Sequence, residues 1–342
     1  MTFIDEKNRN SLYGAVDLGT NTCRLIVGRS LSTAPFVFSV VNSFCRIIHF
    51  GEDLATTKTL STNAIERALL ALEECDRRLR FYRVSHLRCV ATAACREAEN
   101  AEEFLLKVYQ RTGLKVEIIS AQEESELAVA GCIDLFAPTV PYGIVFDIGG
   151  GSTEVVFVAL LSGEAFQVLD TLSLPYGILA LRDPISSLSR KQEISDDIAK
   201  RVHEFASRNA LFQLIGEQKI QMIGASGTVT TLAAMVLKLE RYDRKLVHKV
   251  FLTKKDIYSV IDTIKQMSKD ERLAHPCIGP QRADFILGGI SLFQGIYRIL
   301  EVDTVMVADR GVKEGILRKL IELYPPSLEK SLEICSLNPS AA

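Results

Sequence analysis

Apolar residues along the chain recur at two spacings, one typical of helices and one typical of strands. Helical spacing is clearest over residues 63–82, where Ile65, Leu69, Leu72 and Leu79 fall on one stripe. Short apolar runs with the length of strands occur at 87–91, 115–119, 167–172, 221–227 and 302–308. Because strands and helices alternate, the pattern predicts an α/β fold whose mixed sheets are covered on both faces.

Capping residues and prolines mark the expected ends of the helices. Ser120 and Glu123 have the spacing of a capping box, which predicts a helix from there to about Leu135. Further helices are expected at about 196–215 behind a Ser195 cap, at about 228–239, and from residue 312 to just before Pro325. Between the two halves, Pro138, Pro141 and Gly143 predict a linker.

Two segments 130 residues apart resemble each other. Residues 15–27 read AVDLGTNTCRLIV, and residues 145–157 read VFDIGGGSTEVVF. Each is an apolar run, an aspartate, a glycine-rich turn with hydroxyl side chains and a second apolar run, which predicts a β-hairpin. Two such hairpins a domain's length apart predict a duplicated fold.

Composition narrows the class of protein. The 342 residues are 47% hydrophobic, and 40 Lys and Arg face 42 Asp and Glu, for a formal net charge of −2. Such a chain can build two cores, and it lacks the broad basic surface expected of a nucleic-acid partner. The apolar run at 285–297 is too short to span a membrane, and the first ten residues hold no apolar signal segment. We therefore expect a cytoplasmic protein with no membrane partner.

The eight cysteines give no sign of metal or redox chemistry. They are scattered without a C-x-x-C pair, so we expect most of them to be reduced and buried. Cys23 and Arg29 match the C-x5-R spacing of cysteine phosphatases. The residues between them form a strand pattern, whose backbone donors cannot converge on the thiol.

Three loops combine glycine with hydroxyl side chains, at residues 17–22, 147–152 and 224–228. Small residues allow backbone N–H groups to approach an anion, and Ser or Thr adds donors, so the loops are candidate phosphate cradles. A single loop of this kind could equally be an ordinary tight turn. The chain contains no Gly-Lys pair, which excludes a P-loop of the Walker type.

Two carboxylates end apolar strands just before these turns. Asp17 and Asp147 are placed to hold a divalent cation against a phosphate chain, and Glu154 on the return strand could complete the site. The alternative is that each aspartate caps its own turn. The first repeat has Arg24 where the second has Glu154, which favours one metal site in the second repeat with cationic help from the first.

A third carboxylate lies in the acidic cluster Glu123, Glu124 and Glu126 at a helix N-terminus. Glu123 is explained by the capping box, whereas Glu124 is either a first-turn acid that favours the helix dipole or a general base that activates water. Arg96, in a turn after a strand, is either a phosphate ligand or a solvated arginine. Arg282 is interpreted in the same way.

Six ordered motifs between about Tyr13 and Leu323 resemble the exopolyphosphatase/guanosine pentaphosphate phosphohydrolase family. They read DLGTNTCR, ATAACREAEN, IISAQEESEL, VFDIGGGSTE, GASGT and ADRGVKEGIL. The resemblance implies two RNase H-like domains of the actin-like ATPase superfamily flanking a cleft, over residues 1–135 and 136–308. A C-terminal helix at about 309–323 is expected to pack back on the first domain. Larger members carry a further C-terminal region resembling an HD-type domain, so the short two-domain form is expected here.

The resemblance also implies roles for residues. Glu124 is the implied catalytic residue, and Asp147, Glu154 and Asp17 are the implied ligands of Mg²⁺, with Mn²⁺ as an alternative. The implied substrate-binding residues are Gly19, Thr20, Asn21, Thr22, Arg96, Gly149, Gly150, Gly151, Ser152, Ser226, Gly227, Thr228 and Arg282.

The implied activity is release of the terminal phosphate of polyphosphate. Guanosine pentaphosphate is the alternative substrate, and a homodimer is the implied assembly. More distant alternatives are an actin-like ATP-binding protein and a sensor of guanosine alarmones.

Overall fold

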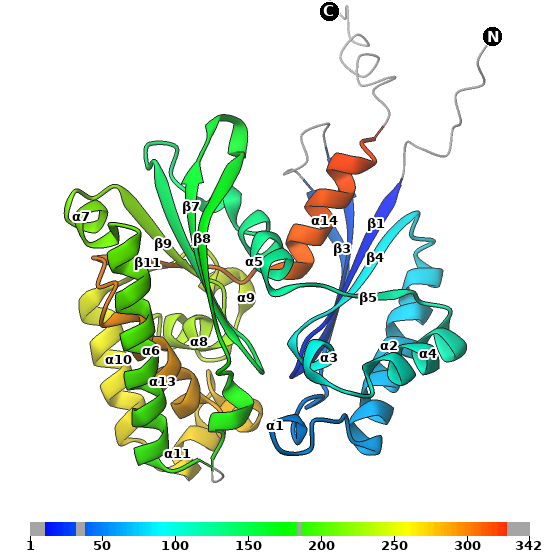
Figure 1. Cartoon of the computed structure of the whole chain (residues 1–342), viewed down its shortest axis with the longest axis horizontal. Coiled ribbons are helices and arrows are strands. Elements are labelled where there is room, and N and C mark those ends of the chain that lie inside the picture. Colours follow the sequence, from blue (N-terminus) through cyan, green and yellow to red (C-terminus); the bar gives the residue numbers. More distant parts are fainter. Residues whose placement is uncertain (1–10, 32–37, 184–185, 327–342) are drawn as a thin grey trace, which may run out of the picture.

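The computed structural model describes residues 11–31, 38–183 and 186–326. It forms two sheets, each built around one of the repeated hairpins (Figure 1). The first sheet contains β1 (Leu12–Leu18), β2 (Thr22–Ser30), β3 (Phe38–Ile47), β4 (His86–Ala91) and β5 (Val116–Ile118). The second sheet contains β6 (Tyr142–Ile148), β7 (Thr153–Leu160), β8 (Phe166–Leu174), β9 (Ile220–Gly224), β10 (Phe251–Thr253) and β11 (Thr304–Val307). The first ten residues and Cys335, on which sequence predictions were made, lie outside the described residues.

Strand order repeats between the sheets. The first sheet runs β3-β2-β1-β4-β5, and the second runs β8-β7-β6-β9-β11 with β10 added at its edge. In both, the hairpin strands are antiparallel and the next two strands are parallel to the first hairpin strand. This repeat confirms the duplicated fold and the two RNase H-like units. The predicted boundaries at residues 135 and 308 stay predictions.

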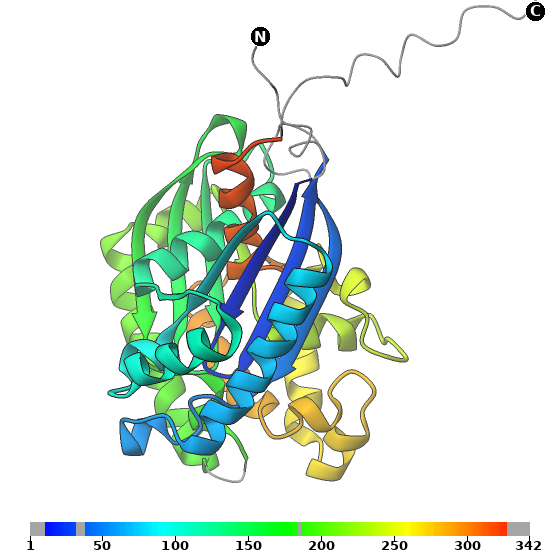
Figure 2. The same cartoon turned by 90° about the vertical axis from the view of Figure 1, so that its right-hand side faces the viewer.

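Helices cover the outer faces of both sheets. Each sheet and its outer helices form one lobe of the protein. The helices of the first lobe are α1 (Leu54–Thr57), α2 (Thr62–Phe81), α3 (Ala93–Glu97) and α4 (Ala101–Thr112). The second lobe adds α6 (Leu188–Arg208), α7 (Leu211–Gly216), α8 (Gly227–Val236), α9 (Arg244–Val247), α10 (Lys254–Gln266), α11 (Lys269–Ala274), α12 (Gly279–Arg282) and α13 (Ile286–Tyr297). Helices α2 and α4 pack on the outer face of the first sheet, and Figure 2 shows α2 crossing in front of its strands. Helices α6, α8, α10 and α13 bury the outer face of the second sheet.

The inner faces of the two sheets are covered by a central layer, which consists of α5 (Ala121–Ala130) and α14 (Val312–Leu323). Alternation along β1 points Leu12, Val16 and Leu18 outward and Tyr13 and Ala15 inward, where α14 packs on them. On the other side, Val129 of α5 contacts the inner residues of β6, β7 and β9. The Tyr13 hydroxyl also donates to the Tyr324 carbonyl, 2.6 Å away, at the end of α14.

Glycines set the crossing of α5 and α14. A Cβ atom on Gly315 would lie 1.9 Å from the Leu127 carbonyl oxygen, and one on Gly131 would lie 2.2 Å from the Gly311 carbonyl oxygen. Backbone therefore meets backbone at two points of the central layer, and neither contact leaves room for a side chain.

Several predicted elements match the structure, and some differ. The stripe of α2 is buried behind a Ser61 cap, as predicted. The predicted Ser195 cap is wrong: α6 begins at Leu188 behind Ser187, because Lys191 and Ile194 already belong to its buried face. The helix that was predicted to reach about Leu135 ends earlier. Helix α5 stops at Ala130, because Gly131 meets the backbone of α14 there.

The predicted capping box at Ser120 is half formed. The Ser120 hydroxyl accepts from the Glu123 amide at 3.1 Å, but the Glu123 carboxylate pairs with Arg88 at 2.7 Å.

Two further predictions concern single residues. Gly143 belongs to β6 rather than to a linker, and Cys23 lies within β2, which confirms that it is not part of a phosphatase loop.

The crossing of α5 and α14 yields a stability prediction. We expect Gly315→Ala to lower the free energy of unfolding by about 3 kcal/mol, because the added methyl must push the two helices apart. Urea unfolding followed by circular dichroism measures the change. The control is Gly216→Ala at the end of α7, where a Cβ meets nothing within 4 Å and the change should be neutral or slightly stabilising. Equal effects of the two variants would contradict the close crossing.

Candidate active site

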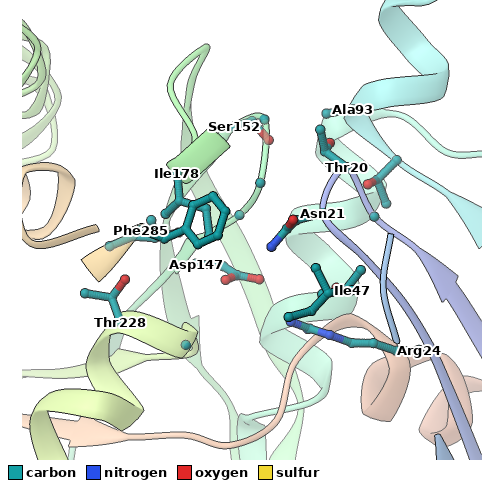
Figure 3. Close-up of a pocket in the computed structure, with 18 of the residues that line it drawn as sticks. Thr20, Asn21, Arg24, Ile47, Ala93, Asp147, Ser152, Ile178, Thr228 and Phe285 are labelled. Carbon is teal, nitrogen blue, oxygen red and sulfur yellow. The ribbon is translucent and has the colours of Figure 1, made fainter. Parts of the chain in front are cut away.

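A cleft of about 250 Å³ lies where the two hairpin turns meet between the lobes. Figure 3 shows Asp147 reaching into it from the second lobe, and Asn21 and Arg24 from the first. Its walls include residues from both hairpins, the start of α5, the start of α8 and the segment 281–286. Both repeats and the central layer therefore contribute to one site.

The two glycine-rich turns have the same backbone geometry and touch each other. In each, the first glycine donates its N–H to a carbonyl three residues on, Gly19 to Thr22 and Gly149 to Ser152, both at 2.9 Å. A Cβ atom on Gly150 would lie 2.8 Å from the Asn21 nitrogen, and one on Gly151 would lie 2.9 Å from the Thr20 hydroxyl. The contact explains why the second turn has glycines where the first has Thr and Asn.

The predicted metal carboxylates project toward the central layer from the ends of their strands. In the hairpin registers Asp17 faces Arg24, and Asp147 faces Glu154. Burial raises the pKa of Asp17 and raises that of Asp147 to about 7, with the Arg24 charge opposing both shifts. Burial also raises the pKa of Glu154 well above its usual range, and its Oε1 atom is buried with no hydrogen-bond partner. Among the residues that the structure describes, no hydrogen bond supports an Asx cap by either aspartate.

Cations lie beside these carboxylates. Burial opposes the charge of Arg24, but Asp17 and other nearby acids outweigh it and raise its pKa. From α14, Lys313 pairs with Glu314 at 2.7 Å, and both residues are buried. The Lys313 charge acts on Asp17 and Asp147, so the start of α14 lowers the cost of their ionisation although Lys313 itself does not line the cleft.

Glu124 lies in the first turn of α5 and lines the cleft. Its side chain is 15% exposed, and its Oε2 accepts from Arg96 Nη1 at 2.7 Å. The same Nη1 donates to the Ile119 carbonyl at 3.0 Å, which fixes the guanidinium between α3 and α5. Burial raises the pKa of Glu124, and Arg96 and the Thr92 hydroxyl oppose that rise.

Most of the predicted site residues come together in the cleft. Its lining includes Asp17, Gly19, Thr20, Asn21, Thr22, Glu124, Asp147, Gly149, Gly150, Gly151, Ser152, Gly227, Thr228 and Arg282. Glu154, Arg96 and Ser226 are not part of the lining. Arg96 lies in helix α3 rather than in a turn and contacts Glu124, so its role as a phosphate ligand stays a prediction that these contacts do not favour.

The third loop starts α8 and approaches Arg282. The Ser226 hydroxyl accepts from the Val229 amide at 3.3 Å and so caps the helix, while Thr228 lines the cleft. Arg282 donates from Nη1 to the Thr231 hydroxyl at 2.7 Å, and its guanidinium carbon lies 4.1 Å from the centre of the Tyr242 ring. Helix α8 therefore begins at the third loop and also binds Arg282 through Thr231.

Some residues in or beside the cleft have no predicted role. Lys313 and Glu314 lie beside it and occur in the motif ADRGVKEGIL, where a Lys-Glu pair between glycine and apolar residues was the signal that could have found them. Ile47 and Phe285 form an apolar part of the wall, which carries no signal in the sequence.

The acidic groups fit a divalent cation that is shared with a ligand. Within the described ranges, no set of three or more His, Cys, Asp and Glu side chains is arranged to hold a metal by itself. Mg²⁺ needs only one or two carboxylates when phosphate oxygens and water complete its shell. The unpaired Glu154 oxygen and the raised pKa of Asp147 are those of carboxylates that a nearby cation would stabilise.

Comparison with known proteins assigns the family. The model of the Ppx/GppA phosphatase family matches residues 28–323. The chain belongs to this family. No helix in the described part of the chain has the length and apolar character needed to cross a bilayer.

Relatives in this family include enzymes and solved structures. The chain is 28% identical over 328 residues to a bifunctional 3-dehydroquinate synthase/phosphatase of Fusobacterium nucleatum, covering 93% of this chain and 48% of that protein. It is 29% identical over 321 residues to exopolyphosphatase 2 of Mycobacterium tuberculosis, covering 90% and 97%. The crystal structure of the Aquifex aeolicus family member is 30% identical, with a TM-score of 0.72 over 93% of this chain and 99% of that one. An exopolyphosphatase-like protein gives 27% identity and a TM-score of 0.78 over 91% and 98%.

The raised pKa of Asp147 predicts how stability depends on pH in the metal-free protein. An acid whose pKa rises from 3.8 to about 7 on folding destabilises the fold increasingly between those values, and fully above pH 7. As the pH rises from 5 to 8 in EDTA, we expect the free energy of unfolding of Asp147→Asn to increase by about 1–3 kcal/mol relative to that of the parent. Urea unfolding at both pH values measures this.

Asp170 provides a control of opposite sign. Burial would raise the pKa of Asp170, but Arg208 and Asn209 hold it below its usual value. The stability that this carboxylate supplies is present above about pH 4, so Asp170→Asn should be less stable than the parent at pH 5 and at pH 8. If the free energy of unfolding of Asp147→Asn and that of the parent changed equally between pH 5 and pH 8, the raised pKa of Asp147 would be contradicted.

Proposed function

We propose that this protein is a magnesium-dependent phosphohydrolase that releases the terminal phosphate of inorganic polyphosphate. Membership of a phosphatase family and the names of its exopolyphosphatase relatives support the reaction class. The observation that carries the proposal is the position of Glu124, which faces the two glycine-rich turns across the cleft from the start of α5.

Glu124 would orient the attacking water and accept its proton. Its pKa is raised by burial, which makes the carboxylate a better base, while the bond from Arg96 opposes that rise and fixes the direction of the carboxylate. Arg96 then acts as a positioning residue. This geometry suits phosphoryl transfer, in which the protein contributes mainly position and charge.

The phosphates would lie against the turns. Backbone N–H groups of residues 20–22 and 150–152 and the Thr228 hydroxyl supply donors, and Arg24 and Arg282 supply positive charge. These groups belong to rigid elements, so little reorganisation is needed as charge develops on the leaving oxygen.

Asp147 and Glu154, with Asp17, would hold the Mg²⁺ ion, and Mn²⁺ fits the same ligands. When bound, the ion would offset the charge of the terminal phosphates. A homodimer and a cytoplasmic location stay predictions.

Replacing the base tests the chemistry. We expect Glu124→Gln to lower phosphate release at least 100-fold while leaving polyphosphate binding within a few-fold of the parent, because the amide keeps the shape but cannot accept the proton. A colorimetric phosphate assay and fluorescence binding measure the two effects. The matched control is Glu126→Gln on the same helix, whose side chain bonds to Gln122 at 3.2 Å. Activity of Glu124→Gln near that of Glu126→Gln would refute the role of Glu124.

Substrate and metal are tested together. Phosphate release is measured from tripolyphosphate, long polyphosphate and guanosine pentaphosphate, each with Mg²⁺ and with EDTA. We expect release from polyphosphate that depends on Mg²⁺, because the Asp147 and Glu154 carboxylates otherwise repel phosphate. If phosphate is released only from guanosine pentaphosphate, that nucleotide is the substrate in place of polyphosphate. Full activity in EDTA would contradict the metal site.

A further inference from the structure

A second cavity, of about 540 Å³, lies next to the cleft. The two share Ile47, Gln281 and Phe285 in their walls, so one opens beside the other. His49 of the first lobe and Arg182 of the second also line it. Like the cleft, this cavity is built from both lobes.

The second cavity has one unpaired positive charge in its wall. The Arg182 side chain makes no hydrogen bond or ion pair with any residue that the structure describes. Two carboxylates also line the cavity, but Asp183 is paired with Lys191 at 2.6 Å and Arg272 at 2.9 Å. The other, Asp284, is paired with Lys269 at 2.8 Å. Both aspartates of the wall are thus neutralised by cations outside the lining, and the guanidinium of Arg182 has no countercharge among the described residues.

The wall opposite Arg182 is tied to the first glycine-rich turn. The amides of Ile48 and His49 both donate to the Asn21 carbonyl, at 2.9 and 3.2 Å. His49 adopts a left-handed φ of 46°, which is strained for this residue type, and its ring stacks on Phe285 at a centroid distance of 5.8 Å. The loop that cradles phosphate in the cleft and the wall of the second cavity are therefore one connected piece of backbone.

We propose that the second cavity is an anion subsite for the distal phosphates of a polyphosphate chain whose terminal phosphate lies in the cleft. The inference rests on the proposed function. Each phosphate unit carries a negative charge, so a chain leaving the cleft past Phe285 and Gln281 reaches an arginine fork without a partner. A nucleoside fits less well, because the aromatic faces of His49 and Phe285 already stack on each other.

Chain length supplies the test, with Arg182→Gln as the variant. If the subsite exists, the three phosphates of tripolyphosphate occupy the cleft, whereas a long chain also contacts Arg182. We expect the ratio of kcat/KM for long polyphosphate to kcat/KM for tripolyphosphate to fall about tenfold, as for loss of one charge-assisted bond. The fall should lie in KM, shrink with added salt, and be partly restored in Arg182→Lys.

Arg190→Gln is the matched control, because Arg190 lies nearby on α6 but is exposed and paired with Glu193 at 3.1 Å. It should leave the ratio unchanged. An unchanged ratio in Arg182→Gln, or the same fall in both variants, overturns the subsite. A fall confined to guanosine pentaphosphate would overturn it too and assign the cavity to a nucleoside.

Binding separates this inference from the proposed function. Long polyphosphate is titrated into Glu124→Gln and into the double variant Glu124→Gln with Arg182→Gln. If the double variant binds about tenfold more weakly than Glu124→Gln, the subsite is supported, even if the parent protein releases no phosphate from polyphosphate. If the two variants bind equally, the subsite is overturned, even if the parent protein does release phosphate.

Discussion

The contact between α5 and α14 is the constraint on which both lobes depend. The backbones of the two helices meet at Gly131 and Gly315, and this central layer covers the inner faces of both sheets. Because side chains alternate along β1 and β6, the last inward positions of those strands are Asp17 and Asp147. The same layer carries Glu124 at the start of one helix and Lys313 at the start of the other. A packing arrangement thus brings three carboxylates to one cleft and places the charge of Lys313 where it acts on two of them.

Those charges bear on how a nearly neutral protein would bind the polyanion of the proposed function. Glu124, Asp147 and Glu154 all have raised pKa values because burial penalises their charge. Arg24, Arg96 and Lys313 offset part of that cost. A phosphate chain alone would add negative charge to an acidic floor, so under the proposed function a cation and the substrate would stabilise each other's binding. The net charge of −2 is uninformative about this local balance.

The sequence predicted the repeated part of the fold well and the long-range contacts poorly. The hairpins, α2 and most strands follow local spacing, which is why their positions were found. Ser195 was misplaced as a cap because two acids follow it, although the buried face of α6 begins a turn earlier.

Contacts between distant segments account for the other differences. Half of the residues that line the cleft belong to glycine-rich turns that are recognisable from their motifs. Arg96 was expected at phosphate, but its partner Glu124 lies 28 residues away in sequence. No local pattern reveals that pair, nor the cavity beside Arg182. Such features depend on how the two lobes meet.

The position of α14 in the chain has a consequence for synthesis. The helix that covers the inner face of β1 is made long after that strand, and Tyr13 bonds to a residue 311 positions later. During translation the apolar inner face of the first sheet stays open until α14 has left the ribosome. The first lobe therefore needs protection from aggregation for longer than the second, whose covering helix α5 precedes its strands.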